Sequence, residues 1–414
     1  CPFIMLLPRC IVLIIDVWRL LNCKYFSSDI NNGSVYNNYD INSAVDNYGS
    51  FKLSIMAFIS IDNKLRYCQF RNLHCLIGNE RVIIRHEMSK RNKSRNSDTK
   101  KRKKFNPSRI LKFYWINKAL GYFEHIDSFT HVLYLDTDTI IMDLKIDLLH
   151  EMSKLSSNGD IFISSDIYPY HHRFQTGMFL VRRSYTTFQA FRHLKTQIYQ
   201  NKMEFYSNNT KFDLESDQKV FNQQIRCNSS NETESTPNSI FLPCILSNKI
   251  PINIVNVSRL YFHTFPQLPQ PWQQMGLPNG DEELQVSQIV HFAGVYGGIS
   301  IENGHPNYIA TLIAIKGFID RHIKFLGTIP YMNKSSKRRN TTNLLDIDEA
   351  NWLMKNVSIF MSYCIQDTFT GVMIEVAEKK AKECLKVVKE KVSQLLTPST
   401  KKIIFDCHHT AAYF

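Results

Sequence analysis

The chain has 414 residues, 43% of them hydrophobic and 12% aromatic, a composition that excludes an intrinsically disordered protein. This length allows one large α/β domain, or two ordinary ones, with a buried core. Of the net charge of +13, the segment 85–104 carries +8, from ten Lys or Arg residues and two acids. Charge confined to one segment indicates a solvated insertion, not a basic face, so we expect no nucleic-acid partner.

The N-terminal segment 3–21 is apolar but is interrupted by Pro8, Arg9, Asp16 and Arg19. A membrane-spanning helix needs about 20 largely uncharged residues. Two interpretations therefore stay open: a truncated signal-anchor of a single-pass type II membrane protein, or a buried strand. The polar residues 27–50 are typical of a stem, and we assign 1–50 to anchor and stem together.

Periodicity predicts the elements that follow. The run 53–61 is expected to be the first core strand, and the helical spacing of 110–123 predicts a helix directly before a strand at 132–135. Other expected strands are at 73–84, 160–164, 178–181 and 289–292, and other expected helices at 63–71, 147–155, 185–199, 217–225, 308–326 and 373–396. Alternating strands and helices favour an α/β fold with a mostly parallel sheet flanked by helices. We expect this domain at 51–330, and a C-terminal extension with an amphipathic helix at 331–414.

The strand at 132–135 ends at two carboxylates, Asp136 and Asp138. In an extended chain residues i and i+2 point to the same side, so both acids can converge on one point. Such a pair can hold a divalent cation against a diphosphate at the carboxyl end of a strand. The alternative is a solvated Asp-rich turn, and the pair alone does not separate the two interpretations.

Cysteines and glycosylation acceptors bear on the compartment. No C-x-x-C pair occurs among the ten cysteines, which argues against a zinc ribbon or a thioredoxin-type motif. Cys68 with Cys75, or Cys227 with Cys244, are close enough in sequence to pair in an oxidising compartment, and the sequence decides neither pairing. Asn-x-Ser/Thr triplets favour a Golgi or ER lumenal protein, although an Asn-rich chain also produces them by chance. They begin at Asn32, Asn92, Asn208, Asn228, Asn231, Asn256, Asn333, Asn340 and Asn356.

Several motifs follow one another in a fixed order. They are Trp115 with Lys118, Asp136 to Met142, Gln175 to Arg182, Asp217-Gln218, and His291 to Gly294. This order resembles the retaining GT-A glycosyltransferases, and most closely glycosyltransferase family 34. That family joins fungal Golgi galactosyl- and mannosyltransferases to plant xyloglucan xylosyltransferases. The resemblance spans residues 51–300.

The resemblance implies a Rossmann-like GT-A fold and a transfer reaction. A hexose or pentose would move from a nucleotide-sugar donor to a hydroxyl of a glycan or glycoprotein acceptor, with retention of anomeric configuration. Asp136, Asp138 and His291 are implied as metal ligands. A set of carboxylates and an imidazole suits Mn²⁺ better than Mg²⁺, which stays the alternative ion.

Further roles are implied residue by residue. Asp217 and Gln218 would lie on the reacting face of the donor sugar, although Asp217 also suits an exposed helix N-terminus. Donor-binding roles fall to Asp136, Lys118, Gln175, Gly177 and Gly294. Gln175 stands where the family usually has Asn, so its reach is longer by a methylene. Lys118 is also explained as a solvated lysine on an amphipathic helix, and Gly177 as a turn glycine.

Two other functions are weighed against this one. A glycogenin-like GT-A enzyme would place a lysine after the histidine and glycine, where this chain has Val295 to Gly298. A non-catalytic GT-A-fold glycan-binding protein would keep the fold without turnover. The intact acids and His291 argue against that second alternative.

Overall fold

The computed structural model describes residues 10–14, 48–71, 73–77, 108–122, 129–165, 173–208, 217–227, 240–257, 262, 287–292, 308–330, 344–369 and 373–396. Residues 27–47 of the expected stem, the basic insertion 85–104 and Gly294 lie outside these residues.

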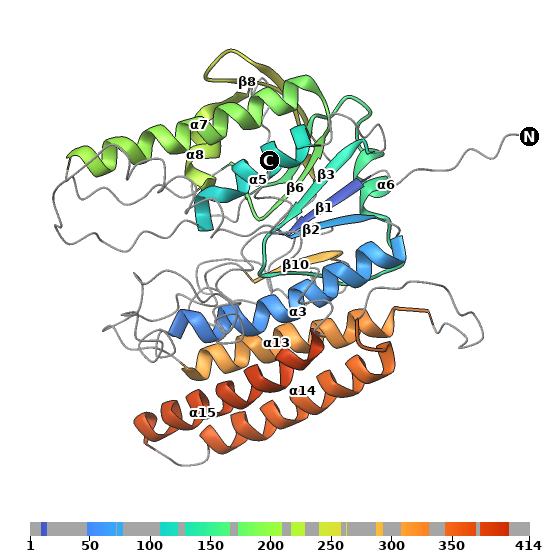
Figure 1. Ribbon diagram of the computed structural model, residues 1–414, viewed down its shortest axis with the longest axis vertical. Coiled ribbons are helices and arrows are strands. Elements are labelled where there is room, and N and C mark those ends of the chain that lie inside the picture. The colour runs from blue at the N-terminus through green and yellow to red at the C-terminus, as the bar shows by residue number, and fades with distance from the viewer. Residues whose placement is uncertain are drawn as a thin grey trace, which may run out of the picture.

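An eight-stranded sheet with the order β2-β1-β3-β6-β5-β9-β8-β7 occupies the middle of the molecule (Figure 1). Its strands are β1 (Cys10–Ile14), β2 (His74–Ile77), β3 (His131–Leu135), β5 (Ile161–Ser164), β6 (Met178–Arg182), β7 (Ile225–Cys227), β8 (Ile240–Leu246) and β9 (Pro251–Val257). A second sheet consists of β4 (Thr139–Ile141) and β10 (Ile289–His291).

The expectation of a mostly parallel sheet is wrong. Three neighbouring pairs of the large sheet are parallel and four are antiparallel. All four antiparallel pairs come from two reversed strands, β6 and β8. The connection from β8 to β9 is a short turn, too short for the crossover that parallel strands require. The Ser165–Phe174 bridge likewise extends the antiparallel pairing of β5 and β6.

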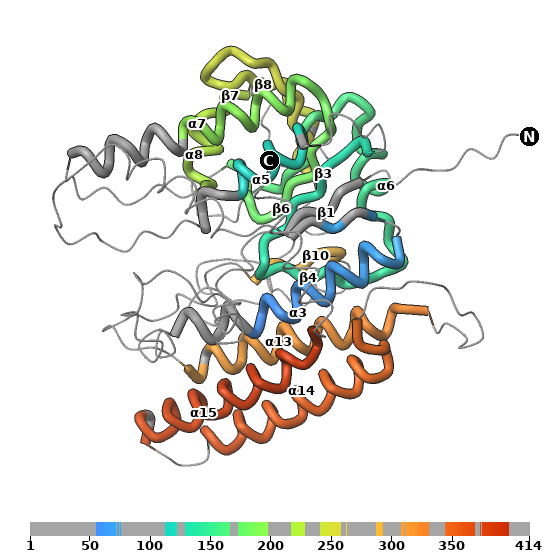
Figure 2. Tube along the Cα trace, in the orientation of Figure 1, coloured from blue at the N-terminus to red at the C-terminus, as the bar shows by residue number. Residues whose placement is uncertain are grey.

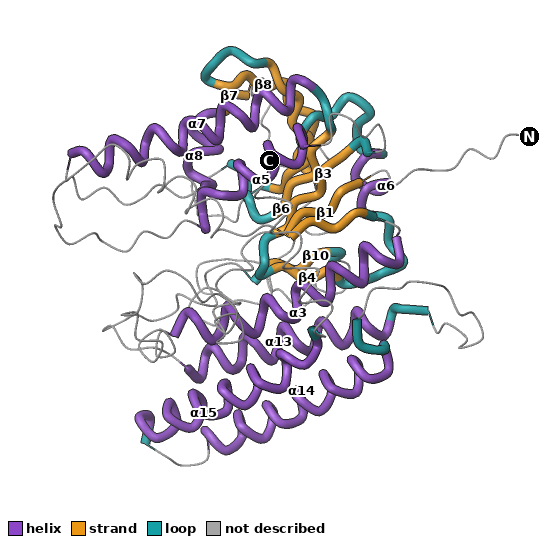
Figure 3. Tube along the Cα trace, viewed as in Figure 1, coloured by secondary structure: helices purple, strands orange, loops and turns teal. Residues whose placement is uncertain are grey.

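Helices cover both faces of the sheet, as Figures 1 and 3 show. One face carries α5 (Ser108–Tyr122), α7 (Tyr185–Asn208) and α8 (Asp217–Gln224). The small sheet, α3 (Tyr48–Arg71), α13 (Tyr308–Gly327), α14 (Ile347–Phe369) and α15 (Ile374–Val392) lie on the other side, and the short α6 (Leu148–Ser153) lies at the sheet's edge. A hydrophobic core lies on each face of the sheet, and alternate residues of β3 belong to different cores. Leu133 and Leu135 face α3 and α13, while Val132 and Tyr134 face α5.

The expectation of a strand at 53–61 is wrong, because this run lies inside α3. Residues 55–61 are all buried, because α3 lies between the small sheet and the C-terminal helices. Within the run 53–61 apolar residues fall on every side of the helix, so this run lacks the charged stripe that marks a surface helix. A short apolar run of this kind has no periodicity that separates helix from strand.

Cys10–Ile14, in the segment weighed as anchor or strand, forms β1 and pairs in parallel with both β2 and β3. Within the described ranges, no helix is long and apolar enough to cross a membrane.

The C-terminal helices share one hydrophobic core with α3 and the lower face of the sheet. The expected amphipathic helix is confirmed as α15, continued by a 3-10 turn at Ser393–Leu395. Figure 2 shows α15, in red, beside α13, and the blue α3 contacts both of these helices. Helix α14, which was not predicted from the sequence, packs against both α13 and α15.

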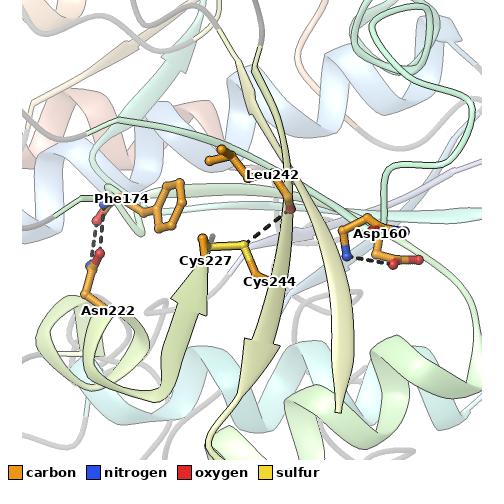
Figure 4. The surroundings of a disulfide bond; sticks show 7 residues. Asp160, Phe174, Asn222, Cys227, Leu242 and Cys244 are labelled. Carbon is orange, nitrogen blue, oxygen red and sulfur yellow. Dashed lines mark hydrogen bonds between the residues drawn. A yellow bond between two sulfur atoms is a disulfide. The ribbon is translucent and has the colours of Figure 1, made fainter. Parts of the chain in front are cut away.

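One of the two candidate disulfides is present. Cys227 on β7 and Cys244 on β8 face each other in register and are bonded (Figure 4), whereas Cys68 and Cys75 are not joined by a disulfide. A second disulfide joins α14 to α15, between Cys364 and Cys384.

Candidate metal centre

The two acids lie in the tight turn that links β3 to β4. The Asp136 backbone N–H donates to the Gly177 carbonyl at 2.9 Å, and the Thr139 hydroxyl donates to the Asp136 carbonyl at 2.7 Å. Asp138 precedes β4 directly. The acids are thus oriented by a turn and not, as expected, by an extended chain. About a quarter of each side chain is exposed, 25% for Asp136 and 26% for Asp138.

His291 meets these acids because β10 pairs antiparallel with β4, which places it opposite Thr139. Its Nε2 atom lies 3.1 Å from an oxygen of Asp138 and 3.9 Å from one of Asp136. One ligand atom from each residue falls within 4.8 Å of the other two. The expectation that this histidine folds back beside the two acids is confirmed.

These spacings fit a shared divalent ion. Two ligand atoms bonded to one ion at about 2.1 Å, at right angles, lie about 3 Å apart. The imidazole and carboxylate donors are those that bind divalent transition metals. Burial raises the pKa of the Asp136 carboxyl; Lys112 opposes this rise and Asp138 adds to it. A cation between the acids would relieve the repulsion between them.

Gly177 leaves the space that the His291 ring occupies. A Cβ added at Gly177 would lie 2.2 Å from Cε1 and 2.5 Å from Nδ1 of that ring. Contacts this short are incompatible with the present ring position. The glycine is therefore required by the histidine, a reason that sequence reading did not supply.

If the candidate centre binds Mn²⁺, we expect Gly177→Ala to weaken that binding by about tenfold or more, because the added methyl group displaces the His291 ring. Gly327→Ala is the matched control, since no heavy atom lies within 4 Å of its added Cβ. Isothermal titration of both variants with Mn²⁺ measures the difference. Equal Mn²⁺ affinities in the two variants would show that the His291 ring can move without loss of metal affinity.

Lys112, which sequence reading missed, connects the acids to Asp217. Its ammonium lies 3.3 Å from Asp136 and 2.5 Å from Asp217, and it donates to the Thr176 carbonyl at 2.9 Å. Burial alone would lower the pKa of Lys112, but Asp136 and Asp217 overcome this effect and raise it to about 12. Lys112 is therefore a permanent cation beside the candidate metal centre.

Asp217 begins α8 and is buried against the segment that precedes β6. Its carboxylate accepts from the Thr176 hydroxyl at 2.5 Å. The helix is held there by Asn222, which exchanges two hydrogen bonds of 2.9 Å with the backbone of Phe174 (Figure 4). Asp217 is thus connected to Asp136 through ion pairs that both residues make with Lys112.

Two predicted donor-binding residues, Gln175 and Lys118, and the predicted catalytic residue Gln218 make other contacts. Gln175 is buried, and its side-chain carbonyl accepts from the Gly177 N–H at 3.1 Å. Lys118 lies with its ammonium 5.5 Å from the centre of the Trp115 ring, and burial lowers its pKa. Gln218 lies next to Asp217 at the start of α8 and is half-buried.

A cavity of about 900 Å³ lies at the opposite end of β3. His131, His150, Arg182, Arg183 and Tyr185 are among its lining residues, and none of the predicted site residues is. Burial, with Arg182 nearby, lowers the pKa of His131 from its ordinary 6.5 to about 4.

His131 should make folding depend on pH. Between pH 4 and 6.5 the unfolded chain binds this proton and the folded chain does not, so stability rises with pH and then stays constant. Over this pH range the free energy of unfolding can change by at most roughly 3 kcal/mol, at 1.36 kcal/mol per pH unit. Urea unfolding from pH 4 to 7 should show a smaller slope for His131→Gln than for the wild type. Identical slopes would mean that His131 titrates normally in the fold.

Comparison with protein-family models gave no match, and neither did comparison with curated proteins. Among solved structures, the chain is similar to a glycosyltransferase involved in glycosylation of the major capsid of PBCV-1. The two share 11% identity over 69% of this chain and 94% of that one, with a TM-score of 0.36. An active-site mutant of LgtC has 9% identity, coverage of 78% and 98%, and a TM-score of 0.33. Mouse xyloside xylosyltransferase 1 has 9% identity, coverage of 69% and 97%, and a TM-score of 0.31. Scores this low assign neither the fold family nor the activity of this chain.

Proposed function

We propose that this protein is a divalent-metal-dependent glycosyltransferase of the GT-A type. It transfers a hexose or pentose from a nucleotide-sugar to a hydroxyl of a glycan or glycoprotein, with retention of configuration. The observation that carries the proposal is the convergence of Asp136, Asp138 and His291, although 153 residues separate Asp138 from His291.

Each part of this centre has a use in that reaction. Asp136, Asp138 and His291 would hold Mn²⁺, with Mg²⁺ as the alternative ion. A bound divalent ion stabilises the negative charge that grows on the diphosphate as the glycosidic bond breaks. Lys112 pairs with both Asp136 and Asp217 and so fixes the two carboxylates relative to each other.

Asp217 is the candidate for the reacting face of the sugar, with Gln218 beside it. A retaining enzyme needs a group there that stabilises positive charge on the sugar or forms a transient adduct. Because Lys112 and Thr176 already bind one oxygen of Asp217, this carboxylate has a fixed orientation. Roles in donor binding for Lys118, Gln175, Gly177 and Gly294 stay part of the proposal.

The test is a panel of nucleotide-sugars incubated with the purified protein, with Mn²⁺, with Mg²⁺ and with EDTA. The proposal predicts slow release of nucleoside diphosphate from one donor, only with a divalent ion present. NMR of the first sugar formed in the presence of an acceptor should show the anomer of the donor. No release from any donor, with intact Mn²⁺ binding, would favour the non-catalytic glycan-binding alternative.

We also propose a lumenal compartment, Golgi or ER. The Cys227–Cys244 and Cys364–Cys384 disulfides support it, because disulfides persist in oxidising compartments. The Asn-x-Ser/Thr triplets provide the test: in a secretory host, glycosidase treatment should lower the apparent mass of the protein. An unchanged mass, together with reduced cysteines, would contradict this location.

A further inference from the structure

Strand β4 has one edge paired with β10 and a second edge that faces α3. Residues 138, 140 and 142 direct their backbone groups toward β10, with the Phe292 N–H donating to the Asp138 carbonyl and the Met142 N–H to the Gln288 carbonyl, both at 2.8 Å. Thr139 and Ile141 therefore direct theirs toward α3. Among the described strands, none pairs with this second edge.

Side chains of α3 take the place of the missing strand. Asn63 Nδ2 donates to the Ile141 carbonyl at 3.0 Å, and the Ile141 N–H donates to Asn63 Oδ1 at 2.9 Å. One amide thus satisfies both backbone groups of Ile141, as a neighbouring strand would.

The Thr139 carbonyl is bound in the same way. Lys64 Nζ donates to it at 2.9 Å, and the Ser60 hydroxyl reaches it at 3.5 Å and contacts the Lys64 ammonium. The Thr139 N–H donates to the Asp136 carbonyl, so all four outward backbone groups of β4 have partners. Burial lowers the pKa of Lys64 to about 7, and both its charged and neutral forms can donate this bond.

The spacing and burial of these residues call for a reason. Ser60, Asn63 and Lys64 are spaced i, i+3 and i+4, so they share one face of α3, and each is fully buried. Buried polar side chains, and a lysine above all, destabilise a fold unless their bonds are satisfied. These three are satisfied largely by the backbone of β4.

We propose that Ser60, Asn63 and Lys64 are positioning residues for the metal centre. By binding the outer edge of β4 they fix this strand against β10, and Asp138 and His291 thereby stay at metal-sharing distance. The metal part of this inference rests on the proposed function; the positioning of β4 does not.

The experiment compares Asn63→Leu and Lys64→Met with the wild type and with Asn117→Leu. Asn117 is a matched control: it is buried, on α5, and donates to the Phe188 carbonyl at 2.9 Å. Hydrogen exchange in the metal-free protein is followed over residues 139–142 and 287–292, and Mn²⁺ affinity is measured by titration. Melting temperatures show whether loss of stability alone accounts for any change.

In both α3 variants the backbone amides of residues 139–142 and 287–292 should exchange about tenfold faster than in the control, or more. The Mn²⁺ dissociation constants of these variants should rise about 10- to 100-fold. Unchanged exchange in both variants, or faster exchange with unchanged Mn²⁺ affinity, would overturn the proposal. If the wild type binds no Mn²⁺, the proposed function fails and exchange alone decides the positioning of β4. Lys64→Met removes a buried amine and should fold, so it decides alone if Asn63→Leu does not.

Discussion

Asp138→Asn is expected to reduce transferase activity by about a thousandfold, since losing a ligand removes roughly 4 kcal/mol of charge stabilisation at the diphosphate. Asp138 lies nearer to His291 than Asp136 does, 3.1 Å against 3.9 Å, so an amide there should impair the centre more directly. Initial rates at saturating donor and Mn²⁺ measure the loss.

Asp143→Asn is the matched control for this change. It is the same substitution five residues along the chain, and within the described residues the Asp143 side chain accepts one hydrogen bond, from the nearby Lys145 N–H. Its rate should stay within about twofold of the wild type, as for other surface changes. Equal rates for the two variants would show that Asp138 has no part in catalysis.

Lys112→Met is expected to lower the free energy of unfolding by about 3–5 kcal/mol, because it leaves the buried carboxylate of Asp217 without its cation. Asp217 is nearly buried, and its carboxylate is 2.5 Å from the ammonium that the variant loses. Activity should also fall, since Asp136 and Asp217 would no longer be held together. Urea unfolding at neutral pH measures the stability.

Lys118→Met provides the comparison, since it removes the same charge from the same helix. The Lys118 ammonium lies over the Trp115 ring, an interaction worth about 0.5–1 kcal/mol. If Lys118→Met destabilised the protein as much as Lys112→Met, the Lys112 network would not have the energetic role assigned to it.

The residues of the candidate metal centre could be predicted because their signal in the sequence is local and ordered. An apolar strand that ends at Asp136 and Asp138 is visible in the sequence, and β10 ends at His291 in the same way. The sequence reading did not show why they meet, which is the antiparallel pairing of β4 with β10.

Lys112 was not predicted from the sequence as a residue of the candidate site. Lys112, Ile116 and Ala119 lie at i, i+4 and i+7, so Lys112 belongs to the buried face of α5. A lysine within an apolar face was the available signal for a buried ion pair. The order of the motifs predicted a role for Lys118 instead. Lys118 is half-buried on another side of the helix.

The fold could be predicted where periodicity was clear, as for α5, β3, β5, β6 and α13. It could not be predicted for α3, whose run 53–61 is buried and apolar on every side, nor for the direction of β6, and no strand was expected at the position of β8. Strand direction depends on how the connections run in space, which alternation of elements does not encode.

The most direct measurement is the anomalous diffraction of a crystal soaked with Mn²⁺. The account predicts one strong peak about 2 Å from an oxygen of Asp136, an oxygen of Asp138 and Nε2 of His291. A nucleoside diphosphate added to the crystal should place its phosphates on that same ion. A fully soaked crystal with no peak between these three residues would contradict the account.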